Sequence, residues 1–221
     1  MAELSGRRVD ILGYSQGGMV PRWALRFWPD TRIHVAAFVA LDPSNHGTLD
    51  AQALCQAQCP PAYWQPASGA RFIAALNSGA EPFAGIAYTV VYSRTDEIVT
   101  PNTSAAGSSA LHTAGGWIEN IAVQQICPAD PSEHLAVGSF DPVGFALAVD
   151  AFTYEGLADL ARIPAGVCTE GFSPAVDPRT FPTDYAGFLA EIGAAASESP
   201  ETAAEPPLSG YVFARPGSRG R

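Results

Sequence analysis

The sequence predicts an α/β fold, in which a mostly parallel sheet carries helices on both faces. Apolar runs at residues 35–41 and 86–93 are continuous rather than alternating, which is typical of strands buried on both faces. Each run ends in a polar loop, the place where open α/β sheets hold their sites. A shorter apolar run at residues 9–12 leads directly into a helical pattern. These three features indicate the fold class.

The turn after that first run has the sequence of a nucleophile elbow. Residues 13–17 read Gly-Tyr-Ser-Gln-Gly and match G-x-S-x-G, in which the serine lies at a sharp strand-to-helix turn with its hydroxyl exposed. We expect Gly13 and Gly17 to be required there, because a Cβ atom at either position would collide. Ser15 is therefore the candidate nucleophile, and a plain helix N-cap is the alternative.

The helix after the elbow should pack on the sheet through one face and end near Trp28, before Pro29. Pro21 falls within its first turn, where the missing N–H has no effect on the helix. The apolar stripe expected on the packed face consists of Met19, Val20, Trp23, Ala24 and Phe27.

Composition limits the function. The 221 residues are 47% hydrophobic, enough for a single core. A formal net charge of -10 argues against nucleic acid or anionic membrane surfaces as steady partners. We expect no run that spans a bilayer and no signal peptide, since Met1 lies only a few residues before the elbow strand.

Two further strands place an acid and a histidine on loops. The strand at residues 86–93 is followed by Asp96, and a strand expected at residues 121–126 is followed by His134. Together with Ser15 they give the hydrolase order of serine, acid and histidine. This order predicts a nucleophile relay built from Ser15, Asp96 and His134.

Other residues compete for these roles. Asp42 follows the strand at residues 35–41 and is the next candidate for the acid, while Asp130 lies close to His134 in sequence. His46 precedes the acid and so breaks the usual order. The two remaining histidines, His34 and His112, are more simply surface residues.

The remaining segments give weaker signals. Residues 49–79 are alanine-rich and helical in places, and form either a cap over a pocket or a kinked crossover helix. Helices are expected at residues 142–152 and 183–196. Asn102 begins a glycosylation sequon, a pattern that is common by chance. The four cysteines fit no zinc spacing and allow three disulfide connectivities, with buried free thiols as the alternative.

With these residues in place, the chain resembles the Candida antarctica lipase B family of fungal and bacterial lipases over residues 9 to about 216. The most specific pieces are residues 15–18 and 92–101, the His134 loop behind Cys127 and the tail from residue 205. The spacing of the three relay residues is also close to that family's. Cutinases share the elbow sequence but place the histidine much nearer the aspartate, which makes them the second choice.

The resemblance implies an α/β-hydrolase fold with Ser15 as nucleophile, Asp96 as orienting acid and His134 as general base. It also implies that the Gln16 backbone N–H belongs to the oxyanion hole. The residues it places at the substrate pocket are Tyr14, Ser44, Thr48, Gln65, Ile98 and Val99. It implies a disulfide between Cys127 and Cys168, and we expect a local one between Cys55 and Cys59, for which the family offers no counterpart.

The same resemblance implies a longer N-terminal region, because in this fold several strands and a loop with a second oxyanion donor precede the elbow strand. We therefore expect residues 1–196 to be the C-terminal two-thirds of an α/β-hydrolase catalytic domain whose N-terminal strands are missing. Residues 197–221 should form a Pro/Ser/Glu-rich linker and tail that packs on this domain or frays from it. A partner chain or the missing segment should cover the edge of the elbow strand, and activity should be impaired.

The predicted function is that of a secreted lipase or carboxylesterase, which cleaves carboxylic esters such as acylglycerols through an acyl-enzyme and meets a lipid–water interface transiently. We expect it to need no metal and no organic cofactor. The alternatives are a cutinase-like esterase and a non-catalytic remnant of the fold that binds lipid or a partner chain.

Overall fold

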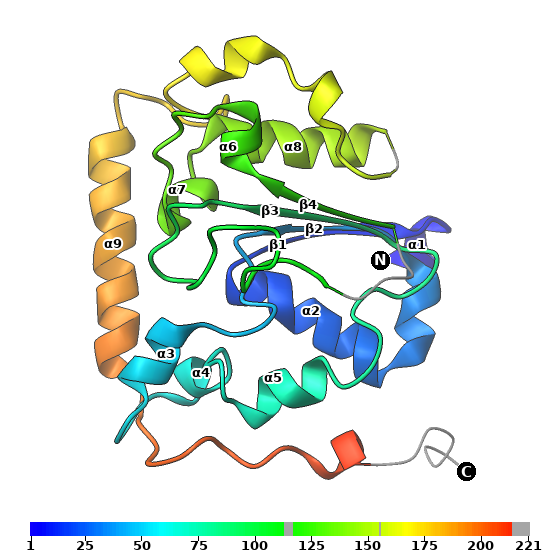
Figure 1. Ribbon diagram of the computed structural model, residues 1–221, viewed down its shortest axis with the longest axis vertical. Helices are drawn as coiled ribbons and strands as arrows, with labels where there is room; N and C mark the ends of the chain where they lie inside the picture. Colours follow the sequence, from blue (N-terminus) through cyan, green and yellow to red (C-terminus); the bar gives the residue numbers. More distant parts are fainter. Residues whose placement is uncertain (113–116, 155, 214–221) are drawn as a thin grey trace.

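A four-stranded parallel sheet forms the centre of the computed structural model, which describes residues 1–112, 117–154 and 156–213 (Figure 1). The strands lie side by side in chain order as β1 (Val9–Tyr14), β2 (Val35–Leu41), β3 (Ala87–Tyr92) and β4 (Trp117–Ala122). Because all four run in the same direction, the loops that follow them gather at one edge of the sheet.

Helices cover both faces of this sheet, as the sequence predicts. In Figure 1, α2 to α5 lie below the sheet, α6 and α8 lie above it, and α9 stands at its left. The α-helices are α1 (Ala2–Ser5), α2 (Gln16–Phe27), α3 (Leu49–Leu54), α4 (Pro61–Trp64), α5 (Arg71–Leu76), α6 (Val123–Ile126), α7 (His134–Val137), α8 (Pro142–Thr153) and α9 (Phe181–Glu198). Short 3₁₀ turns are η1 (Pro29–His34), η2 (Leu160–Arg162), η3 (Ala165–Thr169) and η4 (Gly210–Phe213).

Strand β2 shows why its sequence is a continuous apolar run. Its alternate residues point to opposite faces. Val39 packs in a cluster with Leu147 of α8, whereas Phe38 packs in a second cluster with Leu25 of α2. Both faces of the strand are therefore buried, and a polar side chain would have no solvent to reach.

The stretch His134–Thr153, which includes α7 and α8, is long and apolar enough to cross a bilayer, so the expectation that the chain holds no such run is wrong. More than half of its most apolar window, 56%, is buried inside the fold. Helix α8 packs on β2 and β3, and its apolar composition matches this place in the core.

The expected strand at residues 121–126 is wrong in its second half. Strand β4 ends at Ala122, and residues 123–126 form α6 instead. The Gln125 side chain accepts a hydrogen bond from the Ala122 N–H at 2.7 Å, which caps the start of that helix. The beginning of the strand escaped the sequence analysis because Trp117 and Glu119 are exposed, so the run of buried residues starts only at Ile121.

Helix α2 spans the expected residues, but its packed face differs from the predicted stripe. Val20 is exposed, whereas Leu25 and Arg22 are buried. The Arg22 guanidinium donates to Asn45 Oδ1 at 2.9 Å and to Asn77 Oδ1 at 2.8 Å, so its burial is accompanied by hydrogen bonds. Helical periodicity alone does not reveal a buried arginine of this kind.

The C-terminal segment runs back along the helices below the sheet (Figure 1). Cys59 and Thr202 form an isolated antiparallel bridge, and the Trp23 Nε1–H donates to the Tyr211 hydroxyl at 2.9 Å. Residues 214–221, the last part of the tail expected at residues 197–221, lie outside the described residues.

Candidate active site

The elbow forms where the motif places it, between β1 and α2. Ser15 has a left-handed backbone, with φ 53°, and its N–H donates to the Leu41 carbonyl of β2 at 2.8 Å. A Cβ atom at Gly13 would lie 2.2 Å from the Gly17 carbonyl oxygen, so this glycine is required. The expectation for Gly17 is wrong, since a Cβ there would meet nothing within 4 Å. The second required glycine is Gly18, where a Cβ would lie 2.7 Å from Pro43.

His134 is buried at the start of α7 and lies between Ser15 and Asp96. Its Nε2 is 2.9 Å from the Ser15 Oγ, and its Nδ1 is 3.0 Å from the Asp96 Oδ2. Glu133, the residue before it, caps α7 by accepting hydrogen bonds from the N–H groups of Leu135 and Ala136. The cap fixes the helix start that holds the imidazole in this position.

Asp96 is held by four hydrogen-bond donors. Its Oδ1 accepts from the N–H groups of Ile98 and Val99, both at 2.8 Å, and its Oδ2 faces His134 and the Asn102 amide, the latter at 3.3 Å. This arrangement favours an ionised carboxylate. Asn102, read from the sequence only as a sequon, is 2% exposed, and its amide nitrogen also contacts Ser109 Oγ at 2.9 Å. Its place beside the acid has no signal in the sequence.

The competing acids and histidines take no part in these hydrogen bonds. Asp42 lies close to the relay, but both ring nitrogens of His134 face Asp96 and Ser15 instead. The Asp130 Oδ1 accepts from the Ser132 N–H at 2.8 Å. His34 lies in η1. His46 Nε2 is 2.8 Å from Glu81 Oε1, and the His46 ring stacks on the His112 ring at 4.1 Å.

Gln16 is the first residue of α2, so its N–H has no acceptor within the helix. This N–H lies at the positive end of the helix dipole. The Gln16 side chain donates to Gln65 Oε1 at 2.9 Å, which ties the elbow to the segment after α4. These contacts suit an oxyanion donor at Gln16, and its role stays a prediction.

The residues expected at the substrate pocket divide into two groups. Ser44, Thr48 and Val99 are buried, and Thr48 Oγ1 donates to the Ile98 carbonyl at 2.6 Å. Gln65 and Tyr14 are half-buried, and Ile98 is exposed. Only the second group offers surface to a substrate in this structure, and the pocket assignment of all six stays a prediction.

Tyr14 packs against the catalytic histidine candidate. Its ring lies 5.0 Å from the His134 ring, and a Cβ at Gly138 would fall 2.2 Å from the Tyr14 ring. The Tyr14 hydroxyl is buried without a hydrogen-bond partner. Burial raises the pKa of Tyr14 far above its usual value. Tyr14 is therefore a neutral, apolar wall for the imidazole.

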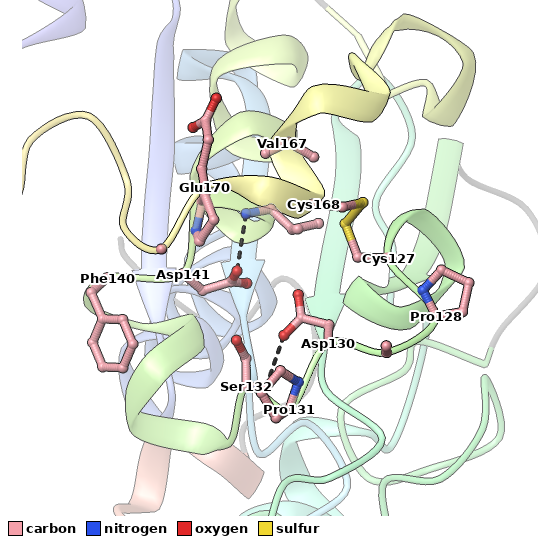
Figure 2. A pocket seen from close by; sticks show the side chains of 14 residues that line it. Cys127, Pro128, Asp130, Pro131, Ser132, Phe140, Asp141, Val167, Cys168 and Glu170 are labelled. Carbon is pink, nitrogen blue, oxygen red and sulfur yellow. Dashed lines mark hydrogen bonds between the residues drawn. A yellow bond between two sulfur atoms is a disulfide. The ribbon is translucent and has the colours of Figure 1, made fainter.

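Both expected disulfides are present, Cys55–Cys59 and Cys127–Cys168. The Cys127–Cys168 disulfide borders a cavity of about 390 Å³ beside the loop that leads to His134 (Figure 2). The carboxyl groups of Asp130 and Asp141 lie between this disulfide and Phe140 in the cavity wall. Burial raises the pKa of Asp141 to about 6. None of the three relay residues lines this cavity.

Within the described ranges, Asp42, Asp96 and His134 form the one group of metal-ligand type, with one ligand atom of each lying within 4.8 Å of the others. Both ring nitrogens of His134 already face Ser15 and Asp96. The geometry therefore suits a proton relay better than a metal site.

The comparisons with known proteins agree with this geometry. No protein-family model matches the chain. The chain is 29% identical to lipase B from Pseudozyma antarctica over 224 residues, which cover 97% of this chain and 62% of that protein. It matches the crystal structure of Aspergillus fumigatus lipase B with a TM-score of 0.83 and 30% identity, over 96% of this chain and 52% of that one.

These matches confirm the resemblance to lipase B and the α/β fold of hydrolase type. The chain spans about three fifths of the length of the first relative and about half of the second. What the whole relatives do is therefore a basis for a proposal about this chain and not a finding about it.

Proposed function

We propose that the chain is a serine hydrolase that cleaves carboxylic esters, such as acylglycerols, through an acyl-enzyme intermediate. The observation that carries the proposal is the position of His134, which bridges Ser15 Oγ at 2.9 Å and Asp96 Oδ2 at 3.0 Å. Similarity to two proteins named lipase B supports the substrate class.

The roles follow from the contacts. The Asp96 carboxylate accepts the Nδ1–H of His134, which leaves Nε2 unprotonated and facing the Ser15 hydroxyl. As Ser15 Oγ attacks the ester carbonyl, Nε2 takes the hydroxyl proton and then gives it to the leaving alcohol. Water repeats the sequence on the acyl-enzyme, releasing the carboxylic acid and restoring Ser15. The N–H of Gln16 stabilises the oxyanion formed in each half-reaction.

We propose that the protein works in an oxidising, extracellular compartment. Two disulfides join all four cysteines of the chain, an arrangement that reducing cytosol does not maintain. Peptide mapping without reductant, on protein recovered from the culture medium of its source, should show both pairs. Free thiols at these positions in the recovered protein would contradict the assignment.

The function is tested by Ser15→Ala. The variant should lose hydrolysis of p-nitrophenyl butyrate by roughly 10⁴-fold or more, because removing the nucleophile disables the relay as a unit. A fluorophosphonate should add one covalent adduct to the native chain and none to the variant, as read by intact mass. Ser78→Ala, which changes an exposed serine at the end of α5, is the control and should keep both signals. Equal activity in Ser15→Ala and the native chain would refute the proposal.

A further inference from the structure

A second buried carboxyl group lies directly behind the relay. Asp42 is 0% exposed, and one of its carboxylate oxygens lies within 4.8 Å of both an Asp96 oxygen and a His134 ring nitrogen. Its Oδ1 accepts from the Ser93 N–H at 2.8 Å, whereas its Oδ2 is buried with no hydrogen-bond partner. A buried carboxyl oxygen without a partner needs an explanation.

Two ionised carboxylates at this separation in a buried site would repel strongly, so one of the pair holds a proton. The hydrogen-bond donors around each carboxyl group decide which of the two holds the proton. Asp96 faces the N–H groups of Ile98 and Val99, the His134 ring and the Asn102 amide, all of which favour its anion. Asp42 faces the Ser93 N–H and, at 3.4 Å, the same Asn102 amide. The proton therefore belongs to Asp42.

We propose that Asp42 is a neutral carboxylic acid whose Oδ2 proton is donated to the Asp96 carboxylate, which makes Asp42 a positioning residue for the relay. The inference rests on the proposed function only for its kinetic consequence, since the protonation state follows from the contacts alone. The donated proton gives Asp42 Oδ2 the partner it otherwise lacks, and gives Asp96 a fifth donor that fixes the carboxylate facing His134.

The surroundings of Asp42 support this assignment. Burial raises the pKa of Asp42 well above its usual range, and the charge of Asp96 raises it further. The other titratable groups that act on or near it are Asp141, which is also acidic, Tyr14 and His134. Asp42 also has a left-handed backbone, with φ 39°, and its N–H donates to Val91 of β3 at 2.8 Å. The end of β2 is thus held in a conformation that turns this side chain toward the acid.

The first test is the acid limb of the pH profile of kcat/KM, measured in the native chain and in Asp42→Asn. The variant replaces one neutral side chain with another, so the midpoint of this limb should stay within about 0.3 pH unit of the native value. If Asp42 were ionised, the variant would remove an anion from beside the relay and move the midpoint down by about one pH unit or more, which would overturn the proposal. Asp150→Asn changes another buried aspartate, one that does not act on Asp42; it is the matched control and should leave the midpoint unchanged.

The second test separates positioning from charge. Asp42→Ala leaves the Ser93 N–H without its acceptor, and we expect kcat to fall by about tenfold or more while KM stays near its native value. Asn keeps an oxygen for Ser93 and a donor for Asp96, so Asp42→Asn should recover most of that loss. Equal losses in the two variants, or a loss in Asp42→Asn as large as the ~10⁴-fold expected of Asp96→Asn, would overturn the role of Asp42 as a neutral hydrogen-bond donor.

The third test does not need turnover. The Ser15→Ala variant, labelled with ¹³C at the aspartate carboxyl carbons, should show the Asp42 carbon in its protonated position at pH 7 and the Asp96 carbon in its ionised position. An Asp42 carbon that titrates near pH 4, as a solvated aspartate does, would overturn the proposal even if the chain hydrolyses esters. If the chain proves inactive, this measurement still decides the protonation state.

Discussion

Two neighbouring strands end in residues with left-handed backbones that are not glycine, Ser15 after β1 and Asp42 after β2. Such conformations are costly for residues with a Cβ and persist only where several contacts hold them. Here Ser15 is anchored to Leu41 and Asp42 to Val91, each by a backbone hydrogen bond of 2.8 Å to the next strand. The proposed nucleophile and the buried acid behind the relay are therefore both fixed by the sheet itself.

At the same scale, Tyr14→Phe should stabilise the protein by about 1 kcal/mol, because it removes a buried hydroxyl that has no hydrogen-bond partner. Thermal unfolding measures the change. The control is Tyr88→Phe, which removes a hydroxyl that accepts from the Phe83 N–H at 3.2 Å and should destabilise the protein. A lower melting temperature for Tyr14→Phe would show that the hydroxyl has a partner in solution.

Among the elements, α8 depends on a cap with an unusual pKa. Burial raises the pKa of Asp141 from 3.8 to about 6, although its carboxylate accepts from the N–H groups of Val143 and Gly144. The folded state therefore binds the proton more tightly than the unfolded chain does. Its contribution to stability is complete below about pH 4 and is lost as the pH rises through about 6.

Asp141→Asn removes this titration. Relative to the native chain, the variant's free energy of unfolding should rise by about 2 kcal/mol between pH 4 and pH 7, since each pKa unit corresponds to about 1.4 kcal/mol and part of the change lies below pH 4. Urea unfolding at both pH values measures the difference.

Asp150→Asn gives the opposite sign as a control. Burial acts to raise the pKa of Asp150, but its hydrogen bonds with Arg162 and Asp159 outweigh burial and lower it. The loss of stability in Asp150→Asn should therefore be larger at neutral pH than at acid pH. A pH-independent difference between Asp141→Asn and the native chain would mean that Asp141 has an ordinary pKa.

The disulfide before α7 is the other element-scale constraint. Cys127 and Cys168 are 41 positions apart, and the chain-entropy model gives about 3 to 4 kcal/mol for a loop of this length. We expect the Cys127→Ser/Cys168→Ser double variant to lose that much in denaturant unfolding. Cys55→Ser/Cys59→Ser, which opens a loop of only 4 positions, should lose much less. Equal losses would show that loop entropy is not the source of the effect.

For the molecule as a whole, Glu205 ties the end of the chain to its middle. Its carboxylate accepts from the N–H groups of Arg71 and Phe72, at 2.9 and 2.8 Å, and so caps α5 from more than 130 residues away in sequence. The residue before α5, Ala70, has no side chain that can do this.

Glu205→Ala should therefore lower stability by about 1 kcal/mol, as the loss of a cap does, and loosen residues 199–213. Hydrogen exchange at the Arg71 and Phe72 amides measures the cap, and limited proteolysis measures the segment. Glu201→Ala, at an exposed position of the same segment, is the control and should change neither. Unchanged exchange in Glu205→Ala would show that the cap is not formed in solution.

The sequence predicted those parts of this molecule that local patterns determine. Continuous apolar runs identified β2 and β3, and the elbow motif with the order of acid and histidine selected the three side chains that meet. It did not predict the partnership of Asp42 and Asn102 with Asp96, because this depends on how loops after different strands pack together. The limits of β4 and the burial of Arg22 were missed for the same reason, since each depends on a neighbour distant in sequence.

The order of the strands has a consequence for synthesis on the ribosome. Each strand pairs with the one made just before it, so the sheet can grow by addition at one side as the chain emerges. Ser15 lies in the connection between β1 and β2, and His134 follows β4, 119 positions later. A nascent chain halted after β3 would thus present a finished elbow with no base to take its proton. The proposed relay can therefore form only after β4 has been made, so the Ser15 hydroxyl has no base beside it while the earlier strands fold.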